Sequence, residues 1–154
     1  MNNIEDFDSG EASLDDWLKR RARANQSSGA TRSFVACEGG AVIGYCALAS
    51  GAVDTASAPG RFRRNMPEPI PIAVLARLAV HRAHHGRGLG RALFQDSAAR
   101  VLNAADIIGI RGMVVHAISA EARAFYLALG LAPSPLDPMT VMVTLADIRA
   151  RLVP

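Results

Sequence analysis

The stretch that decides the fold spans residues 84–93 and reads His84-His85-Gly86-Arg87-Gly88-Leu89-Gly90-Arg91-Ala92-Leu93. The apolar run over 72–80 predicts a buried strand before it, and the pattern over 91–102 predicts a helix after it. A glycine-rich turn between a strand and a helix presents backbone N–H groups to phosphate oxygens at the helix N-terminus. The glycines let the backbone approach an anion closely, and Arg87 and Arg91 add donors that suit phosphate. The stretch therefore predicts a binding site for a nucleotide-type cofactor.

The spacing of these residues excludes two common nucleotide motifs. The dinucleotide pattern G-x-G-x-x-G/A fails because Arg91 or Leu93 occupies its last position. A phosphate loop ending in Gly-Lys-Ser/Thr fails because the only lysine in the chain is Lys19. The segment instead resembles the R/Q-x-x-G-x-G/A pyrophosphate loop of GNAT N-acetyltransferases, which bind acetyl-CoA. In that frame Gly88 and Gly90 match, and His85 stands where the family has Arg or Gln.

The composition is typical of a globular protein. The chain has 154 residues, of which 50% are hydrophobic and 20% charged, and this length suffices for one domain with a hydrophobic core. No apolar run reaches the roughly 18 residues that span a bilayer, and the polar start over 1–6 lacks the features of a signal peptide. Cys37 and Cys46 lie in predicted strands without metal-type spacing, so we expect buried free thiols. We expect a cytoplasmic protein with one domain over 1–154, no metal and no membrane contact.

The basic residues are mostly arginine and form two clusters. The net charge is +3, and only one of the 17 basic residues is a lysine. The clusters are Lys19, Arg20, Arg21 and Arg23, and Arg61, Arg63 and Arg64. Such patches suit phosphate and hence nucleic acid, although solvated charges paired on a helix, as in Asp15 with Lys19, explain part of them equally well. Arg77, inside an apolar strand, is expected either near the acceptor cleft or in a buried ion pair with an acid.

The pattern along the chain predicts an α/β fold. We expect a helix that Ser13 caps and that fades near 25–29, a hairpin over 33–49 around a Gly-Gly turn, and an irregular connection over 50–71. A strand over 112–117, a short helix over 121–129, a proline-rich loop, a strand over 139–145 and a tail helix follow. The strand–helix–strand order over 72–117 predicts a parallel pair. The expected architecture is a mixed, mostly antiparallel sheet flanked by helices, with a parallel β-α-β cofactor-binding unit.

A second motif lies downstream of the glycine-rich loop. The stretch Ala124-Phe125-Tyr126-Leu127-Ala128-Leu129-Gly130-Leu131 resembles the A-x-x-F-Y-x-x-x-G-F signature that closes the acetyltransferase core. In that family the tyrosine that matches Tyr126 lies near the thioester sulfur, and a phenol there can protonate the leaving thiolate. The alternative is an amphipathic core residue with its hydroxyl at the edge. Ser119 stands where the family often has Asn, and Leu131 replaces the usual aromatic residue.

The resemblance extends along nearly the whole chain. The stretches 7–11, 13–18, 61–67, 77–80 and 133–140 are similar to TacT-like toxins, the acetyltransferase halves of bacterial toxin–antitoxin pairs. The resemblance implies that the acceptor is the α-amino group of an aminoacyl-tRNA, whose acetylation blocks translation. It also implies a homodimer and an antitoxin of the ribbon–helix–helix class, with no direct contact to DNA by this chain.

The resemblance and the loop together identify candidate site residues. The catalytic candidate is Tyr126, as general acid. The acetyl-CoA candidates are Leu78, Ala79, Val80, His85, Gly86, Arg87, Gly88, Leu89, Gly90, Arg91 and Ser119. The tRNA candidates are Lys19, Arg20, Arg21, Arg23, Arg61, Arg63, Arg64 and Arg77. A backbone N–H near 78–80 would polarise the thioester carbonyl.

Other functions compete with this interpretation. Two alternatives are an acetyltransferase for a small amine or a protein N-terminus and a non-catalytic acyl-CoA-binding module. His81, His84 and His85 suggest a metal site, but no carboxylate or cysteine joins them in the sequence. His116, Ser119 and Asp137 could form a hydrolase triad, but no G-x-S-x-G turn presents the serine.

Overall fold

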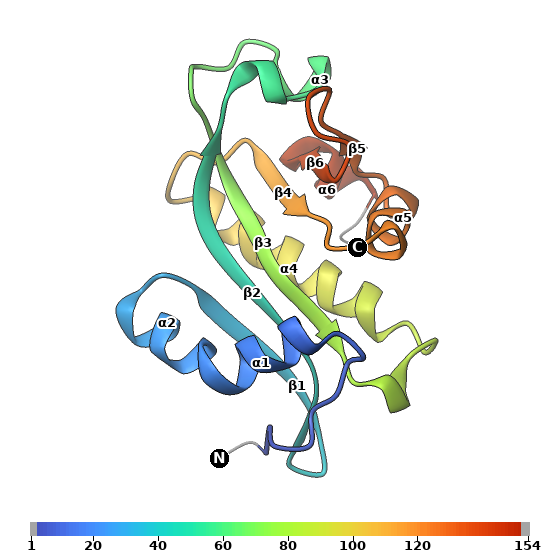
Figure 1. The fold of residues 1–154 in the computed structure, drawn as a ribbon. Coiled ribbons are helices and arrows are strands. Elements are labelled where there is room, and N and C mark those ends of the chain that lie inside the picture. The colour runs from blue at the N-terminus through green and yellow to red at the C-terminus, as the bar shows by residue number, and fades with distance from the viewer. Residues whose placement is uncertain (1–2, 152–154) are drawn as a thin grey trace. The chain divides into compact units, whose positions relative to one another are not determined.

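The computed structural model describes residues 3–151 and contains six strands in one sheet (Figure 1). The strands are β1 (Arg32–Glu38), β2 (Ala41–Val53), β3 (Ile70–Val80), β4 (Gly112–His116), β5 (Ala132–Pro133) and β6 (Thr140–Thr144). The helices are α1 (Ala12–Arg20), α2 (Ala22–Ser28), α3 (Gly60–Arg63), α4 (Leu89–Ala105), α5 (Ala120–Ala128) and α6 (Leu145–Arg151), with short 3-10 turns at Thr55–Ser57 and Arg82–His84. The strand order is β1-β2-β3-β4-β6-β5; β3 and β4 are parallel, and the pairs β1–β2, β4–β6 and β5–β6 are antiparallel. This arrangement confirms the predicted mixed sheet with one parallel pair.

The chain divides into two compact units. The first holds the described residues up to Ala49 together with Ala76–Ser97, and the second holds Ser50–Leu75 together with the described residues from Ala98 onward. Strands β2 and β3 and helix α4 therefore each contribute residues to both units.

The core of the first unit forms around stacked aromatic rings. Trp17 of α1 stacks on Tyr45 of β2 with ring centroids 5.9 Å apart, and Phe7 meets Tyr45 edge-on. Tyr45 is fully buried, and its hydroxyl donates to the Leu14 carbonyl at 2.6 Å. Burial raises the pKa of the Tyr45 phenol, because the charged form would lose its hydration. The apolar face of α1 therefore packs on β2, while α2 lies against β1.

The start of α1 differs from the sequence prediction. Ser13 lies within the first turn of the helix, and Glu11 occupies the N-cap position without a side-chain cap. Asp15 is buried rather than paired on the surface, and its carboxylate accepts hydrogen bonds from the backbone N–H and the hydroxyl of Ser9. The predicted cap was wrong because the chain turns into the helix two residues earlier, where Ser9 and Asp15 tie the preceding loop to the helix.

The predicted hairpin is present as β1 and β2, but one cysteine prediction on it was wrong. Cys37 is exposed near the end of the edge strand β1, on the same side of the strand as the exposed Val35. Cys46, on the inner strand β2, is buried as expected. Neither cysteine forms a disulfide, and the Cys46 Sγ accepts a hydrogen bond from the Ser97 hydroxyl at 3.1 Å.

The first turns of α4 pack closely on the first unit's part of the sheet. A Cβ on Gly44 of β2 would lie 2.9 Å from the Leu93 side chain and 3.3 Å from the Ala79 carbonyl oxygen. A larger residue at 44 would displace the Leu93 side chain and crowd the Ala79 carbonyl, so Gly44 favours the close packing of α4 on β2. The helix spans 17 residues, and within residues 3–151 no helix is long and apolar enough to cross a membrane.

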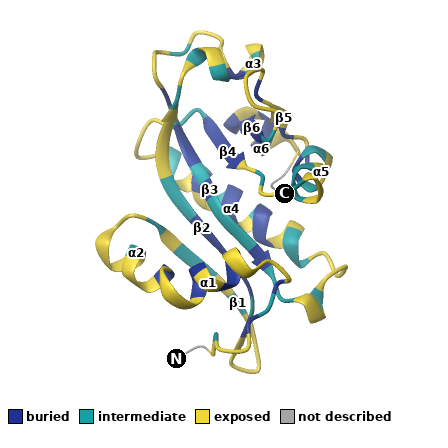
Figure 2. Ribbon diagram, viewed as in Figure 1, coloured by how far each residue is buried: buried dark blue, intermediate teal, exposed yellow. Residues whose placement is uncertain are grey.

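The second unit packs α3 against β4 and β6. Its core contains Ala58, Phe62, Ile70, Ile72, Val114 and Met142. A Cβ on Gly112 would lie 2.1 Å from the Val143 carbonyl oxygen and 2.8 Å from the Phe62 ring, so no side chain fits between these elements. Figure 2 shows β4 buried along most of its length, with exposure beginning at its last residue, His116.

The segment predicted as an irregular connection over 50–71 is more ordered than expected. Strand β2 continues to Val53, α3 occupies Gly60–Arg63, and β3 begins at Ile70. Between them Glu68 accepts hydrogen bonds from the backbone N–H and hydroxyl of Thr55. These side-chain hydrogen bonds stabilise the connection, which its glycines and prolines led us to expect as irregular. The expected tail helix is α6.

Candidate active site

The glycine-rich loop connects β3 to α4 in the first unit. Gly86 and Gly88 have φ values of 77° and 81°, a left-handed conformation that side-chain-bearing residues adopt at a penalty. The first α-helical hydrogen bond runs from the Ala92 N–H to the Gly88 carbonyl at 3.0 Å. The N–H groups of the helix's first turn lack partners within the helix, and its dipole favours an anion there. The exposed residues 85–88 lead directly into this turn, where the sequence predicts the anion site.

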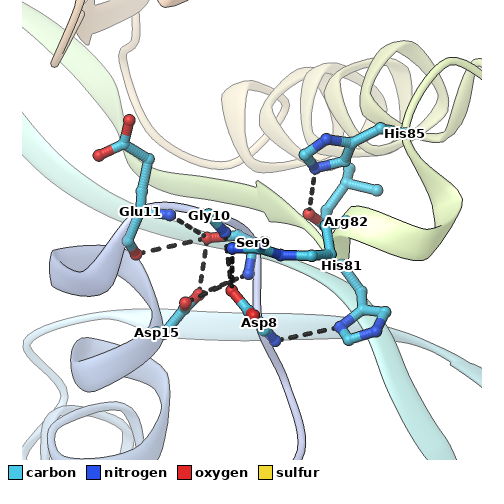
Figure 3. Close-up of polar contacts among 9 residues, drawn as sticks. Asp8, Ser9, Gly10, Glu11, Asp15, His81, Arg82 and His85 are labelled. Carbon is cyan, nitrogen blue, oxygen red and sulfur yellow. Dashed lines mark hydrogen bonds and ion pairs between the residues drawn. The ribbon is translucent and has the colours of Figure 1, made fainter.

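His85 forms a hydrogen bond across the start of the glycine-rich loop. Its Nε2–H donates to the carbonyl oxygen of Val80, the last residue of β3, at 2.7 Å (Figure 3). The residue that replaces the family's Arg or Gln therefore spans the turn between strand and helix. This contact explains how the loop keeps its shape with an imidazole at this position.

The N-terminal segment holds the other side of the same turn. The Asp8 backbone N–H donates to His81 Nδ1 at 3.0 Å, and the Arg82 guanidinium donates to the Asp8 carboxylate at 2.9 Å (Figure 3). The backbone N–H of Gly10 and the Arg82 guanidinium hold the pKa of Asp8 below its usual value. His81 thus uses Nδ1 for structure. Across the described part of the chain no three His, Cys, Asp or Glu side chains gather as a metal site.

The residues predicted beside the thioester lie on β3. Ala79 is buried, whereas Leu78 and Val80 are half-buried. The N–H of the next residue, His81, donates to the Ile43 carbonyl of β2 at 2.8 Å, which fixes the end of the strand. The predicted contacts of these residues with acetyl-CoA remain predictions.

Tyr126 lies on α5 in the second unit. The helix is capped by Ser119, whose hydroxyl accepts from the Ala122 N–H at 3.1 Å, and it ends before Gly130, which has φ of 104°. Tyr126 is 6% exposed, and its ring meets Phe125 edge-on with centroids 5.1 Å apart. The ring body is thus held by packing, as a positioned acid requires. Its catalytic role remains a prediction.

Two residues of the possible hydrolase triad, His116 and Asp137, are connected through Thr140. His116 Nδ1 lies 2.9 Å from the Thr140 hydroxyl, which donates to the Asp137 carboxylate at 2.8 Å. Ser119 instead caps α5. The hydroxyl of Thr140 and the N–H of Met139 hold the pKa of Asp137 below its usual value.

The predicted tRNA-binding residues fall into different environments. Lys19, Arg20, Arg21, Arg23, Arg63 and Arg64 are exposed. Arg61 donates from Nε and a terminal nitrogen to the two Asp147 oxygens at 2.8 and 2.7 Å, and this pair holds the pKa of Asp147 below its usual value. The guanidinium of Arg77 lies 5.2 Å from the Trp17 ring centroid and donates to the Ala76 carbonyl. Arg77 therefore contacts an aromatic ring and a carbonyl oxygen. These contacts differ from the ion pair with a carboxylate that was one of the two expectations for this residue.

A family model described as an acetyltransferase (GNAT) domain matches residues 29–130. The chain belongs to the GNAT acetyltransferase family.

Several relatives of this GNAT chain have named activities or partners. It is 51% identical over 149 residues to a Mycobacterium tuberculosis protein called "tRNA-acetylating toxin", covering 97% of this chain and 90% of that protein. It is 25% identical to AtaT complexed with acetyl-methionyl-tRNAfMet, with a TM-score of 0.90 and coverage of 97% and 91%. AtaTR bound with AcCoA is 26% identical, with a TM-score of 0.84 and coverage of 97% and 90%. The AtaT–AtaR complex bound to DNA is 25% identical, with a TM-score of 0.78 and coverage of 96% and 90%.

Sequence reasoning missed several contacts between polar residues of this GNAT chain. Asp8 and Arg82 are 74 positions apart, and Arg61 and Asp147 are 86 apart, so no local pattern links them. A groove of about 390 Å³ in the second unit also lies outside the predicted set. It is lined by Met66, Pro67, Pro71, Gly109, Ile110, Arg111, Leu145, Ala146 and Arg149.

Proposed function

We propose that this chain transfers the acetyl group of acetyl-CoA to the α-amino group of an aminoacyl-tRNA and thereby blocks translation. The observation that carries the proposal is the high identity, along nearly the whole chain, with the mycobacterial tRNA-acetylating toxin. The loop agrees with it, because two left-handed glycines and a helix N-terminus suit the pyrophosphate of acetyl-CoA.

In this mechanism the chain contributes binding, polarisation and a proton. The N–H groups of residues 86–91 hold the pyrophosphate, and a backbone N–H of residues 78–80 polarises the thioester carbonyl. The acceptor amine attacks in its neutral form, which is accessible because an α-amino group titrates near pH 8 and an adjacent ester lowers its pKa further. The C–N bond forms, the C–S bond breaks, and the Tyr126 hydroxyl gives its proton to the departing thiolate.

The exposed arginines would bind the tRNA. A protein that modifies the acceptor end must hold phosphates away from the reacting amine, largely without reading sequence. Residues 19–23 with Arg63 and Arg64 supply exposed positive charge for this purpose. Arg61 and Arg77 would contribute less, because each already has a partner within its own unit.

We also propose that the chain forms a homodimer and is silenced in the cytoplasm by a ribbon–helix–helix antitoxin. The AtaT–AtaR complex among its structural relatives supports a protein partner of this kind. Contact with DNA would then come from the antitoxin. If a ribbon–helix–helix protein is encoded beside this chain, its co-expression should relieve growth arrest and give a complex on size-exclusion chromatography; growth arrest unchanged by that protein would contradict the proposal.

The test uses purified protein, radiolabelled acetyl-CoA and charged total tRNA. We expect label on the aminoacyl fraction, loss of label when the tRNA is deacylated beforehand, and a steep fall in rate with salt as phosphate contacts are screened. No label on any charged tRNA, with acetyl-CoA still bound, would replace the proposal by a small-amine or protein acceptor.

A further inference from the structure

A chain of three side chains ends at the carboxyl end of β4. His116 closes this strand opposite Thr140, the first residue of β6, and Asp137 lies in the loop just before β6. Thr140 is 6% exposed, whereas His116 is exposed. The arrangement thus runs from a carboxylate through a buried hydroxyl to an imidazole at the surface.

We propose that His116 accepts the proton that the attacking amine releases, while Thr140 and Asp137 set the tautomer of its ring. The proposal rests on the proposed acetyl transfer and adds the proton acceptor that the mechanism above leaves unassigned.

The hydrogen bonds determine the tautomer of His116. The Thr140 hydroxyl has one proton, which it donates to Asp137 Oδ2 at 2.8 Å. Toward His116 it can therefore only accept, so His116 Nδ1 must carry the hydrogen in the 2.9 Å contact. The neutral ring then has its lone pair on Nε2, on the side away from Thr140. A basic nitrogen is thereby presented outward from the end of the strand.

The position of His116 in the sheet favours contact with a substrate. In α/β sheets, ligands bind beyond the carboxyl ends of parallel strands. β4 pairs parallel with β3 at Met113 and Val114, and His116 is the residue at its carboxyl end. His116 lies two residues beyond Val114, and the chain then enters α5, which carries Tyr126. One short segment of the second unit therefore supplies both the proposed acid and the proposed base.

The proton balance of the step is complete with these two residues. The amine nitrogen forms a bond to the thioester carbonyl carbon and becomes positively charged. His116 Nε2 takes one proton from that nitrogen, and the C–S bond breaks. Tyr126 gives its proton to the thiolate, and the imidazolium and phenolate then return to their starting states by exchange with solvent. Proton transfer of this kind typically contributes about 10²–10⁴-fold to a rate.

The charged side chains on α5 and the 134–139 loop are Glu121, Arg123 and Asp137. Asp137 is the acid at the inner end of the chain, and Arg123 of α5 donates from Nε to the Pro138 carbonyl on the same loop. β4, β6 and the 117–119 connection add no other titratable side chain.

The decisive variants separate the hydrogen bond from the base. His116→Asn keeps an N–H donor for Thr140 but lacks the Nε2 lone pair, so we expect unchanged thermal stability, unchanged acetyl-CoA binding and a single-turnover rate about 10²-fold lower. The wild-type rate should fall more steeply in acid than that of His116→Asn, because amine and imidazole must both be neutral. Added imidazole should partly restore His116→Ala. Asp106→Asn, an exposed carboxylate beyond α4, is the matched control and should behave as wild type.

The outcomes distinguish this inference from the proposed function. A wild-type rate and pH profile in His116→Asn, with the wild type labelling aminoacyl-tRNA, would overturn the role of His116 alone. A slower His116→Asn that keeps the wild-type pH profile, with no imidazole rescue of His116→Ala, would reduce His116 to a structural residue and also overturn it. A wild type that labels no aminoacyl-tRNA would overturn both proposals.

Discussion

The glycine loop and the segment 116–126, the α5 region, would contribute to catalysis by different means. The loop is exposed and would act through backbone N–H groups, with Gly86 and Gly88 in left-handed conformations. The α5 region would act through side chains, with Tyr126 held by burial and His116 by hydrogen bonds. The loop should therefore tolerate side-chain changes such as the histidine at 85 but not a change of backbone freedom. The α5 region should instead be sensitive to changes of the side chains at 116 and 126.

Removing one hydroxyl from the α5 region should have the largest effect. We expect Tyr126→Phe to lose about 10²–10⁴-fold in turnover while binding acetyl-CoA normally, because only the proton for the thiolate is lost. Stopped-flow release of coenzyme A, with binding measured by calorimetry, checks both. The matched control is Tyr45→Phe, which removes a buried hydroxyl bonded to Leu14 and should lower stability by about 1 kcal/mol without changing turnover. Equal turnover in Tyr126→Phe and wild type would remove Tyr126 from the mechanism.

Restricting the backbone of the loop should come next in size. Gly88→Ala places an L-residue at φ of 81°, a penalty of about 1–2 kcal/mol, so the Kd for acetyl-CoA should rise about tenfold. The added Cβ meets no atom of the chain within 4 Å, so the effect is conformational. Gly60→Ala also adds a Cβ in open space and should leave Kd unchanged. Identical Kd values for the two variants would show that the loop does not need its left-handed glycine.

Within the arginine cluster at 61–64, Arg64 should contribute more to tRNA binding than Arg61. Arg64→Ala should weaken tRNA binding a few-fold and reduce the slope of log affinity against log salt by about one, since one phosphate contact is lost. Arg61→Ala should change this slope less, because its guanidinium is bound to Asp147. Filter binding at several salt concentrations measures both. A larger slope change for Arg61 would mean that tRNA takes the arginine from Asp147.

The ion pair of Arg61 should appear as an acid-dependent stability. Because Arg61 lowers the pKa of Asp147 in the folded state, the pair stabilises the fold above the ordinary Asp pKa of 3.8 and loses its effect as the pH falls through the lower folded value. We expect Asp147→Asn to melt about 2–4 °C below wild type at neutral pH, with the gap closing below about pH 4. Calorimetry across this range decides it, and a gap independent of pH would indicate lost packing instead.

The sequence predicted those features of the fold that depend on residues close together in the chain. The strand, the glycine turn and the helix over 70–105 follow one another in the chain, so the sequence sufficed to place the loop and the parallel pair. Tyr126 was found through a motif of adjacent residues. The contacts of Asp8 with Arg82 and of Arg61 with Asp147 join distant positions, and only folding reveals them. Likewise, Cys37 is exposed because β1 is the edge strand of the sheet, and strand propensity alone does not show which strand lies at the edge.

The irregular end of β1 gives the protein a natural chemical handle. Of its two thiols, Cys37 faces solvent and Cys46 lies within the first unit. A maleimide dye should therefore attach at one position in the folded wild-type protein and at two after unfolding. The single dye would report by fluorescence anisotropy on any large partner, without altering a residue proposed to bind cofactor or tRNA.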